Sequence, residues 1–209
     1  MDNPQVTWTH PFLHEFLNLI PKNIATLIDV GCGRGIVGAL MRIYRSPKWL
    51  VGVDVFKPYL KFCKQYHLYD EQIRLDLRVG SLPFADKQFN VATCLETIEH
   101  LAKADGKKLL NELERIGKII IISTPNRYFI RYISAPERYF HQRHFDSNPW
   151  QEHLSKWSVS DFTNRGYEVR GVSPYLPFFI PRKFAWIFPS LFYTILAYKA
   201  IGQAGKTCP

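Results

Sequence analysis

This sequence has few acidic residues relative to basic ones, and its cysteines show no pairing pattern. Its 209 residues contain 18 Asp or Glu against 27 Lys or Arg, a formal net charge of +9. That excess favours an anionic partner, which could be a nucleic acid, a membrane surface or a phosphorylated small molecule, and charge alone does not choose among them. The four cysteines form no C-x-x-C pair and no zinc-finger spacing, and the N-terminus does not resemble a signal peptide. We therefore expect a reduced, cytoplasmic protein.

Long apolar runs, repeats and flexible linkers are missing as well. Residues 174–191 are the most apolar part of the chain, but Pro181, Arg182, Lys183 and Pro189 interrupt it and keep it below the ~20 apolar residues that span a bilayer. We expect this segment to pack on the core; its first half could instead line a lipid-accepting pocket or make a peripheral membrane contact. Without a Gly/Ser-rich linker or a low-complexity tract, residues 1–209 are expected to form a single domain.

What the sequence does contain, up to about residue 123, is an alternation of short apolar runs with amphipathic stretches, which is typical of β-α-β units around a parallel sheet. The expected strands are 25–30, 48–55, 75–79, 89–95 and 118–123, and the expected helices between them are 37–44, 58–67 and 105–116. A helix at 158–166 and strands in "YEVRGVS" and "LFYTILAYKA" complete the pattern as an antiparallel hairpin at the sheet edge. The sequence thus predicts an α/β fold with a doubly wound, mostly parallel sheet of seven strands.

The segment 126–150 interrupts this pattern, because it is aromatic, basic and aperiodic. Four arginines alternate with six tyrosines or phenylalanines between positions 127 and 145. We expect a long loop or lid insertion, since long ordered loops in compact domains are usually functional. Arginines among aromatic residues suit single-stranded nucleic acid, or a lid over an anionic, apolar substrate. The alternative is an amphipathic helix whose aromatic side chains pack on the sheet.

The stretch "IDVGCGRG" places Gly31, Gly33 and Gly35 directly after the first expected strand. A turn of this kind, which ends a parallel strand and opens a helix, is where open α/β sheets bind ligands. The spacing differs from the G-x-G-x-x-G of dinucleotide sites, and the G-K-[ST] of a P-loop is absent. Asp29 would repel a pyrophosphate, whereas Asp54, at the end of the second strand, suits the hydroxyl groups of a ribose. S-adenosylmethionine combines a ribose with cationic groups and has no phosphate.

Together with "VGVDV", "LPFADKQFNVATCLETIEHL" and "IIISTPN", this turn makes residues 25–126 resemble class I S-adenosylmethionine-dependent methyltransferases. The resemblance implies a Rossmann-like fold, methyltransferase activity and S-adenosyl-L-methionine as the cofactor. It also implies that Asp29, Gly31, Cys32, Gly33 and Gly35 contact the methionine part of the cofactor, and that Asp54 and Val55 contact its ribose. The adenine would contact Gly80, Ser81 and Leu82, and the methyl end would contact Cys94 and Leu95. Family members often carry an acidic or amide residue where this chain has Gly80-Ser81, so the adenine contact would use backbone groups or the Ser81 hydroxyl.

"CLETIEHL" places Glu96, Glu99 and His100 just after the strand that the resemblance assigns to the methyl end of the cofactor. Methyl transfer from a sulfonium needs an aligned acceptor and, for a hydroxyl acceptor, a group that takes its proton. If this segment is helical, its i,i+3 and i,i+4 spacings put these side chains on one face, as a general base or as ligands of a hard metal ion. A purely structural role for His100 is the third possibility.

The same segment resembles two groups within the family. Ubiquinone-biosynthesis O-methyltransferases show a similar run, followed by a strand that ends in "ST-N". Small-RNA 3′-terminal 2′-O-methyltransferases share E-x-x-E-H, "TPN" and a later histidine four residues before a tryptophan. In that RNA group two glutamates and two histidines bind a divalent cation, and the corresponding residues here are Glu96, Glu99, His100 and His153, with Trp157 at the same interval.

We therefore expect methyl transfer to a small-molecule or lipid-like acceptor, at oxygen. The alternatives are metal-dependent 2′-O-methylation of an RNA ribose, and a non-catalytic RNA- or membrane-binding module on a methyltransferase fold; a DNA partner is not expected. We also expect His153 to lie near His100, because both flank the carboxyl edge of the sheet. A distance beyond about 10 Å from His153 to both glutamates would exclude a shared metal ion.

Overall fold

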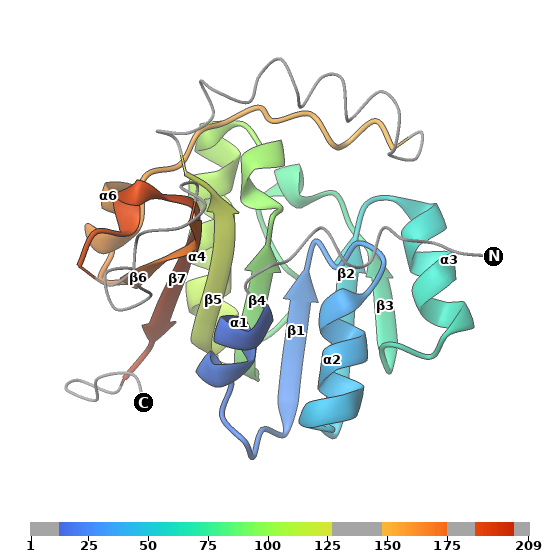
Figure 1. The fold of residues 1–209 in the computed structure, drawn as a ribbon. Helices are drawn as coiled ribbons and strands as arrows, with labels where there is room; N and C mark the ends of the chain where they lie inside the picture. The colour runs from blue at the N-terminus through green and yellow to red at the C-terminus, as the bar shows by residue number, and fades with distance from the viewer. Residues whose placement is uncertain (1–12, 127–147, 175–186, 203–209) are drawn as a thin grey trace.

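The computed structural model describes residues 13–126, 148–174 and 187–202. Its strands form one sheet in the order β3-β2-β1-β4-β5-β7-β6 (Figure 1). The strands are β1 (Thr26–Val30), β2 (Trp49–Asp54), β3 (Glu71–Arg74), β4 (Phe89–Leu95), β5 (Gly117–Pro125), β6 (Glu168–Pro174) and β7 (Phe192–Ala200). β1 to β5 run parallel, and β7 pairs antiparallel with both β5 and β6. The expected mostly parallel seven-stranded sheet with an antiparallel C-terminal edge is confirmed.

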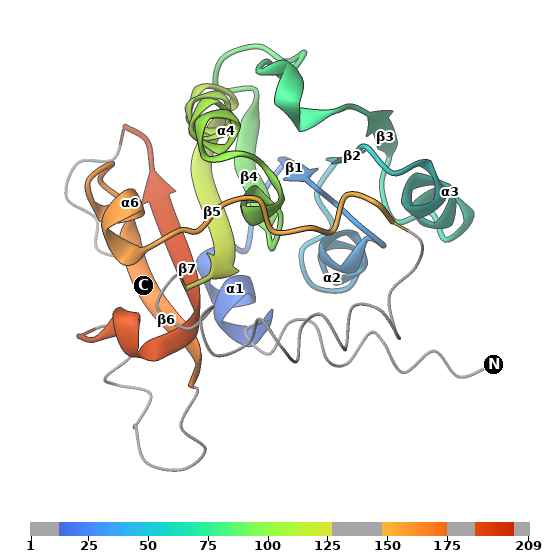
Figure 2. The same ribbon diagram turned by 90° about the horizontal axis from the view of Figure 1, so that it is seen from above.

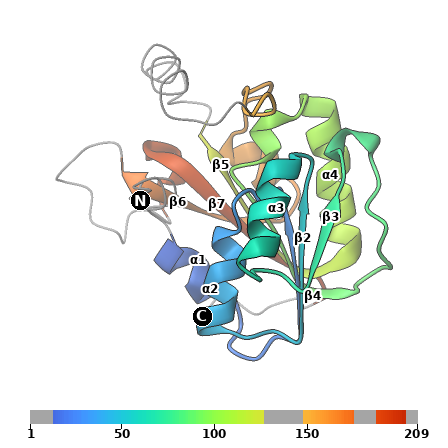
Figure 3. The same cartoon turned by 90° about the vertical axis from the view of Figure 1, so that its right-hand side faces the viewer.

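Helices cover both faces of this sheet. They are α1 (Leu13–Leu19), α2 (Ile36–Tyr44), α3 (Lys57–Gln65), α4 (Lys103–Ile116) and α6 (Val159–Thr163), with the short 3-10 helices η2 (Leu77–Val79), η3 (Ile98–His100) and η5 (Pro189–Leu191). Seen from above, α1 and α2 lie on one face and α4 on the other (Figure 2). The view onto the β3 edge shows the same two layers, with α3 on the side of α2 (Figure 3). Of the five α-helices in the described residues, four were expected from the sequence and α1 was not.

Burial on both faces explains why the central strands read as continuous apolar runs. In β1, Leu27 packs with Met41 of α2 and Phe16 of α1, whereas the next residue, Ile28, belongs to the cluster that includes Leu110 of α4. Side chains alternate between the two faces of a strand, so a strand covered on both sides needs apolar residues at consecutive positions. The core thus fixes the sheet and leaves the carboxyl ends of the parallel strands at one edge.

The expected strand at 75–79 is wrong. The third strand is Glu71–Arg74, and the chain then turns into η2. Asp76 caps η2, because its carboxylate accepts a hydrogen bond from the backbone amide of Arg78 (3.0 Å), and Gly80 ends it with φ at 83°. A short side chain that bonds to a nearby amide competes with strand pairing. β3 itself was not expected, because it is a short edge strand with polar residues and shows no alternation of apolar and polar side chains.

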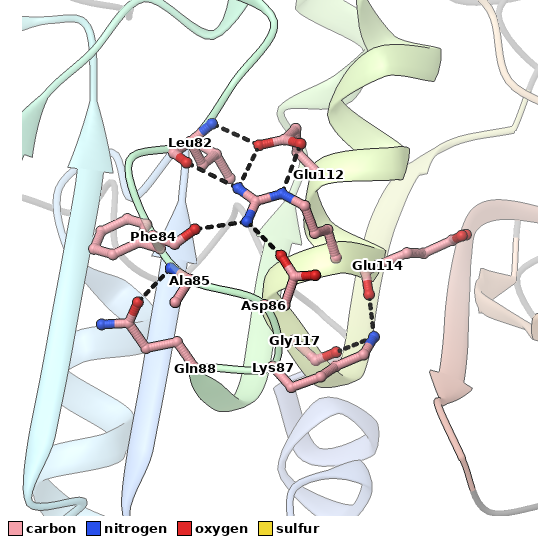
Figure 4. Close-up of polar contacts among 10 residues, drawn as sticks. Leu82, Phe84, Ala85, Asp86, Lys87, Gln88, Glu112, Glu114 and Gly117 are labelled. Carbon is pink, nitrogen blue, oxygen red and sulfur yellow. Dashed lines mark hydrogen bonds and ion pairs between the residues drawn. The ribbon is translucent and has the colours of Figure 1, made fainter.

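Arg115, in the last turn of α4, holds the loop that leads from η2 into β4. Figure 4 shows Leu82, Phe84 and Asp86 of this loop close to Glu112 of α4. The Arg115 guanidinium donates to the carbonyl oxygens of Leu82 (2.9 Å) and Phe84 (2.6 Å). It also pairs with Asp86 (2.9 Å) and Glu112 (2.8 Å), and Glu112 in turn accepts a hydrogen bond from the backbone amide of Leu82 (2.7 Å). A planar group with five donors can satisfy this many acceptors at once. The loop that follows the third strand is therefore tied to α4.

Two expected features lie mainly outside the described residues. The loop or lid at 126–150 falls largely on residues 127–147, and the apolar segment at 174–191 falls largely on residues 175–186. Asn126, at the start of the first of these, forms a parallel bridge with Trp157. In the described part of the chain, no helix combines the length and apolarity needed to cross a membrane.

Candidate active site

The glycine turn after β1 has three glycines with positive φ, and among the described residues only one of them has no close neighbour. A Cβ placed on Gly31 would lie 2.2 Å from the Thr97 Oγ1 atom, and one on Gly35 would lie 2.5 Å from a methyl carbon of Leu68. A Cβ on Gly33, where φ is 52°, would meet no atom of the described residues within 4 Å. The backbone at Gly33 is therefore where a ligand can approach closely. This open position, with the amides that precede α2, fits the expected cofactor.

Asp54, the last residue of β2, connects the second strand to this turn. Its carboxylate accepts hydrogen bonds from the backbone amides of Gly33 (2.9 Å) and Phe56 (2.8 Å). Burial raises the pKa of this carboxyl above its ordinary value, while these backbone hydrogen bonds lower it in part. Each carboxylate oxygen has a second lone pair, so both can also accept from the hydroxyl groups of a ribose. The geometry supports the ribose role expected for Asp54, with Val55 beside it.

Asp29 lies beneath the turn and faces the protein interior. Its two carboxylate oxygens accept hydrogen bonds from the hydroxyl groups of Tyr69 (2.6 Å) and Thr93 (2.8 Å). Burial raises the pKa of Asp29 from 3.8 to about 6, although the two hydroxyl groups oppose that rise. The Tyr69 hydroxyl also accepts from the backbone amide of Gly38 in α2 (3.2 Å). Asp29 thus links β1 to β4 through Thr93 and to α2 through Tyr69. No sequence pattern pointed to Tyr69, a single aromatic residue just before the polar strand β3.

The other residues expected at the cofactor differ in what they can offer. The Cys94 side chain is fully buried, and burial raises the pKa of its thiol well above the ordinary range. A hydrogen bond with Cys63 and burial likewise raise the pKa of the Cys32 thiol. Both thiols therefore stay protonated at neutral pH, a state that does not suit a nucleophile. Leu82 and Leu95 are also buried, whereas Ser81 is exposed after Gly80.

On the acceptor side, the chain turns sharply after β4. Glu96 has a left-handed backbone, with φ at 46°, and its carboxylate accepts a hydrogen bond from the Ser123 hydroxyl (2.7 Å). The Glu99 carboxylate accepts from the hydroxyl of the next residue of β5, Thr124 (2.9 Å). Because η3 begins only at Ile98, Glu96 is not on a helix face with Glu99 and His100, contrary to that expectation. Both glutamates are instead held by the end of β5.

His153 lies beside His100, as expected. Their ring centroids are 4.9 Å apart, and the possible ligand atoms of Glu99, His100 and His153 all lie within 4.8 Å of one another. The amides of Leu154 and Ser155 donate to the carbonyl oxygen of Glu99 (2.8 and 3.0 Å), which fixes this contact. Glu96 is not part of this group in the described structure, so three of the four candidate ligands come together. The cluster can act as a base or hold a divalent ion.

Residues 28–119 match the methyltransferase-domain family. The chain is also similar to the mitochondrial ubiquinone biosynthesis O-methyltransferase of Dictyostelium discoideum, with 29% identity over 131 residues, 56% of this chain and 40% of that protein. It is 32% identical over 126 residues to the small RNA 2′-O-methyltransferase of Mus musculus, which covers 52% of this chain and 30% of that protein. The chain spans less than half the length of these relatives.

Solved structures show the same fold. An S-adenosylmethionine-dependent methyltransferase from Archaeoglobus fulgidus superposes with a TM-score of 0.58 at 16% identity, over 90% of this chain and 91% of that one. A small RNA methyltransferase gives a TM-score of 0.61 at 18% identity, over 92% of this chain and 25% of that chain. At such low identity the likeness establishes the fold alone.

Substituting the glycines of the turn should separate binding from folding. Gly33→Ala should weaken binding of S-adenosylhomocysteine by at least about tenfold, because its methyl group enters the ligand's space. It should lower the free energy of unfolding by only about 1 kcal/mol, the cost of a left-handed alanine. Gly31→Ala should cost about 2–4 kcal/mol, because it adds a clash with Thr97 to that strain. Calorimetry and urea unfolding measure the two effects, and normal binding by Gly33→Ala would contradict the assignment.

Asp29 should make stability depend on pH. Because its pKa is raised in the folded state, its contribution is most favourable below pH 3.8 and is lost as the pH rises through about 6. As the pH rises from about 5 to about 7.5, the unfolding free energy of Asp29→Asn should therefore increase by about 1–2 kcal/mol relative to that of the unsubstituted protein. Urea unfolding of both proteins at each pH measures this gain. A difference between them that stays constant with pH would argue against a raised pKa.

Proposed function

We propose that this chain, which carries a class I S-adenosylmethionine-dependent methyltransferase domain, transfers a methyl group to a hydroxyl oxygen of a small or lipid-like acceptor. Both kinds of curated relative described above are named for transfer to oxygen. The observation that carries the proposal is the cluster of Glu99, His100 and His153, which lies just beyond β4 at the edge where the glycine turn opens. Leu154, next to His153, is 55% exposed and offers an apolar contact to such an acceptor.

His100 is the residue that we assign to the proton of the acceptor. Its Nδ1 atom lies 3.1 Å from the carbonyl oxygen of Glu152, so a proton on Nδ1 is held there and Nε2 keeps the lone pair that accepts the hydroxyl proton. The negative charge of Glu99, buried beside it, favours the imidazolium that forms. The cofactor, when bound, supplies a methyl group on a sulfonium: the oxygen–carbon bond forms while the sulfur–carbon bond breaks, and its electron pair returns to sulfur.

Replacing His100 tests this assignment. His100→Asn keeps a donor for the Glu152 carbonyl oxygen but removes the base, so methyl transfer should fall by about 10²–10⁴-fold. The affinity for S-adenosylhomocysteine should stay within about twofold, since His100 is not placed at the cofactor turn. Labelled S-adenosylmethionine, incubated with the protein and with separate lipid, small-molecule and RNA fractions of a cell extract, measures the transfer. Unchanged transfer by His100→Asn would remove His100 from the chemistry.

Metal-dependent 2′-O-methylation of an RNA ribose is the second candidate, and the ligand geometry favours it specifically. Two imidazoles and a carboxylate within 4.8 Å of one another form a donor set that suits Mn²⁺, Co²⁺ or Zn²⁺. Magnesium prefers oxygen ligands, so it fits this set less well. An ion held by Glu99, His100 and His153 would supply Lewis acidity to a nearby hydroxyl group. The net charge of +9 also suits an RNA acceptor.

If the protein methylates an RNA ribose in this way, it should bind a metal ion, and that binding should depend on His153. The protein should bind Mn²⁺ in a calorimetric titration, and His153→Ala should weaken that binding by at least about tenfold. His14→Ala, on α1, is the matched control and should bind normally. Chelation should abolish labelling of short RNA with a free 3′ end, and added Mn²⁺ should restore it. Labelling of a lipid or small-molecule fraction that resists chelation would instead favour the first candidate.

A further inference from the structure

Residues 148–158, here called the strap, cross the carboxyl edge of the sheet. Figure 2 shows this segment running from α6 over the ends of β5 and β4 towards β2, and Figure 1 shows it above the strand tips. Near its C-terminal end it is anchored by the amides of Leu154 and Ser155, which bind the Glu99 carbonyl oxygen. Lys103 of α4 adds a hydrogen bond to the carbonyl oxygen of Lys156 (2.8 Å). The strap therefore lies over the edge where the glycine turn opens.

The other end of the strap is held by a cation–aromatic contact. The Arg78 guanidinium lies 4.4 Å from the centroid of the Trp150 ring, and the Trp150 amide donates to the side chain of Asn148 (3.0 Å). Asp76 fixes Arg78 with two parallel contacts, from Nε (2.9 Å) and from Nη2 (2.5 Å). Trp150 as a residue is 36% exposed, so part of its surface stays available to a ligand. It is thus placed beside η2, which follows β3.

A nucleoside bound at this edge would bring its base towards Trp150. Asp54 ends β2 and offers its lone pairs to a ribose, while the glycine turn and the acceptor cluster lie on the β1 and β4 side. The base must then lie on the other side of the ribose, towards η2 and Gly80. That is the side on which Arg78 holds Trp150. Aromatic side chains recognise bases by stacking on their flat faces.

We propose that Trp150 closes over the adenine of the bound cofactor, and that Arg78 is the residue that positions it. This inference rests on the proposed function, because it requires S-adenosylmethionine at the glycine turn. The same strap carries His153 only three residues further on, so one segment reaches both the adenine end and the acceptor end of the site.

Calorimetry with S-adenosylhomocysteine and with adenosine tests the proposal. Trp150→Ala should lower the affinity for both ligands by about fivefold or more, since removal of an aromatic side chain that stacks on a base has that effect. Trp150→Phe should restore most of this affinity. Tyr66→Ala is the matched control, because Tyr66 is an exposed aromatic residue with a ring partner of its own, Phe62. Arg78→Ala should also lower the affinity for both ligands, and Arg78→Lys should recover part of the lost affinity.

The outcomes distinguish a failure of the adenine assignment from a failure of the proposed function. If the unsubstituted protein binds no S-adenosylhomocysteine, the proposed function fails. If it binds, and Trp150→Ala binds both ligands equally well, the adenine assignment is overturned, whether or not methylation of an acceptor is impaired. Should Trp150→Ala not fold, the quenching of tryptophan fluorescence on ligand binding decides: Trp150→Phe should lose most of it, and unchanged quenching would overturn the proposal.

Discussion

The hydrogen bond from the Gly33 amide to the Asp54 carboxylate is the contact on which the cofactor side of this protein depends. β1 and β2 are parallel neighbours, with Val30 beside Val53, so the turn after one strand and the carboxylate after the other meet at the same edge. The amides of Gly31 and of the next residue also bind the Val53 carbonyl oxygen (2.8 and 2.9 Å). These bonds leave the backbone at Gly33 facing open space and place an acceptor-rich carboxylate directly beside it.

The carbonyl oxygen of Glu99 has the corresponding role on the acceptor side. It accepts the amides of Leu154 and Ser155, and so brings a segment more than fifty residues further along the chain against η3. This contact, together with that of the His100 ring and the Glu152 carbonyl oxygen (3.1 Å), brings His153 beside His100. Because β4 ends beside β5, the side chain of Glu99 can bond to the Thr124 hydroxyl at the same time. A base or a metal-binding set is thus assembled from two separate segments, η3 and the strap, and a third, the end of β5, supports it at the same sheet edge.

Much of the candidate site could be predicted from the sequence, but the supporting contacts could not. The glycine turn and Asp54 follow from local order, because a strand, a turn and a helix in that succession always leave the turn at the carboxyl edge. The proximity of His153 to His100 was expected because both flank the carboxyl edge of the sheet, although no local pattern links them. No sequence pattern singles out Arg78 or Trp150, because each lies on a segment without a regular spacing of apolar residues. Their contact joins η2 to the strap, two segments that are far apart in the sequence.

The sequence by itself determined the core of the fold, because burial on both faces demands apolar runs whose length and spacing can be read directly. β4 was predicted at its observed bounds, Phe89–Leu95, and every residue but Asn90 is buried. Tertiary structure alone decided what the exposed and polar residues do. Asp76 turned an expected strand into η2 through one hydrogen bond, and Tyr69 reached Asp29 across 40 positions. Such contacts depend on distances between segments, which an apolar period does not encode.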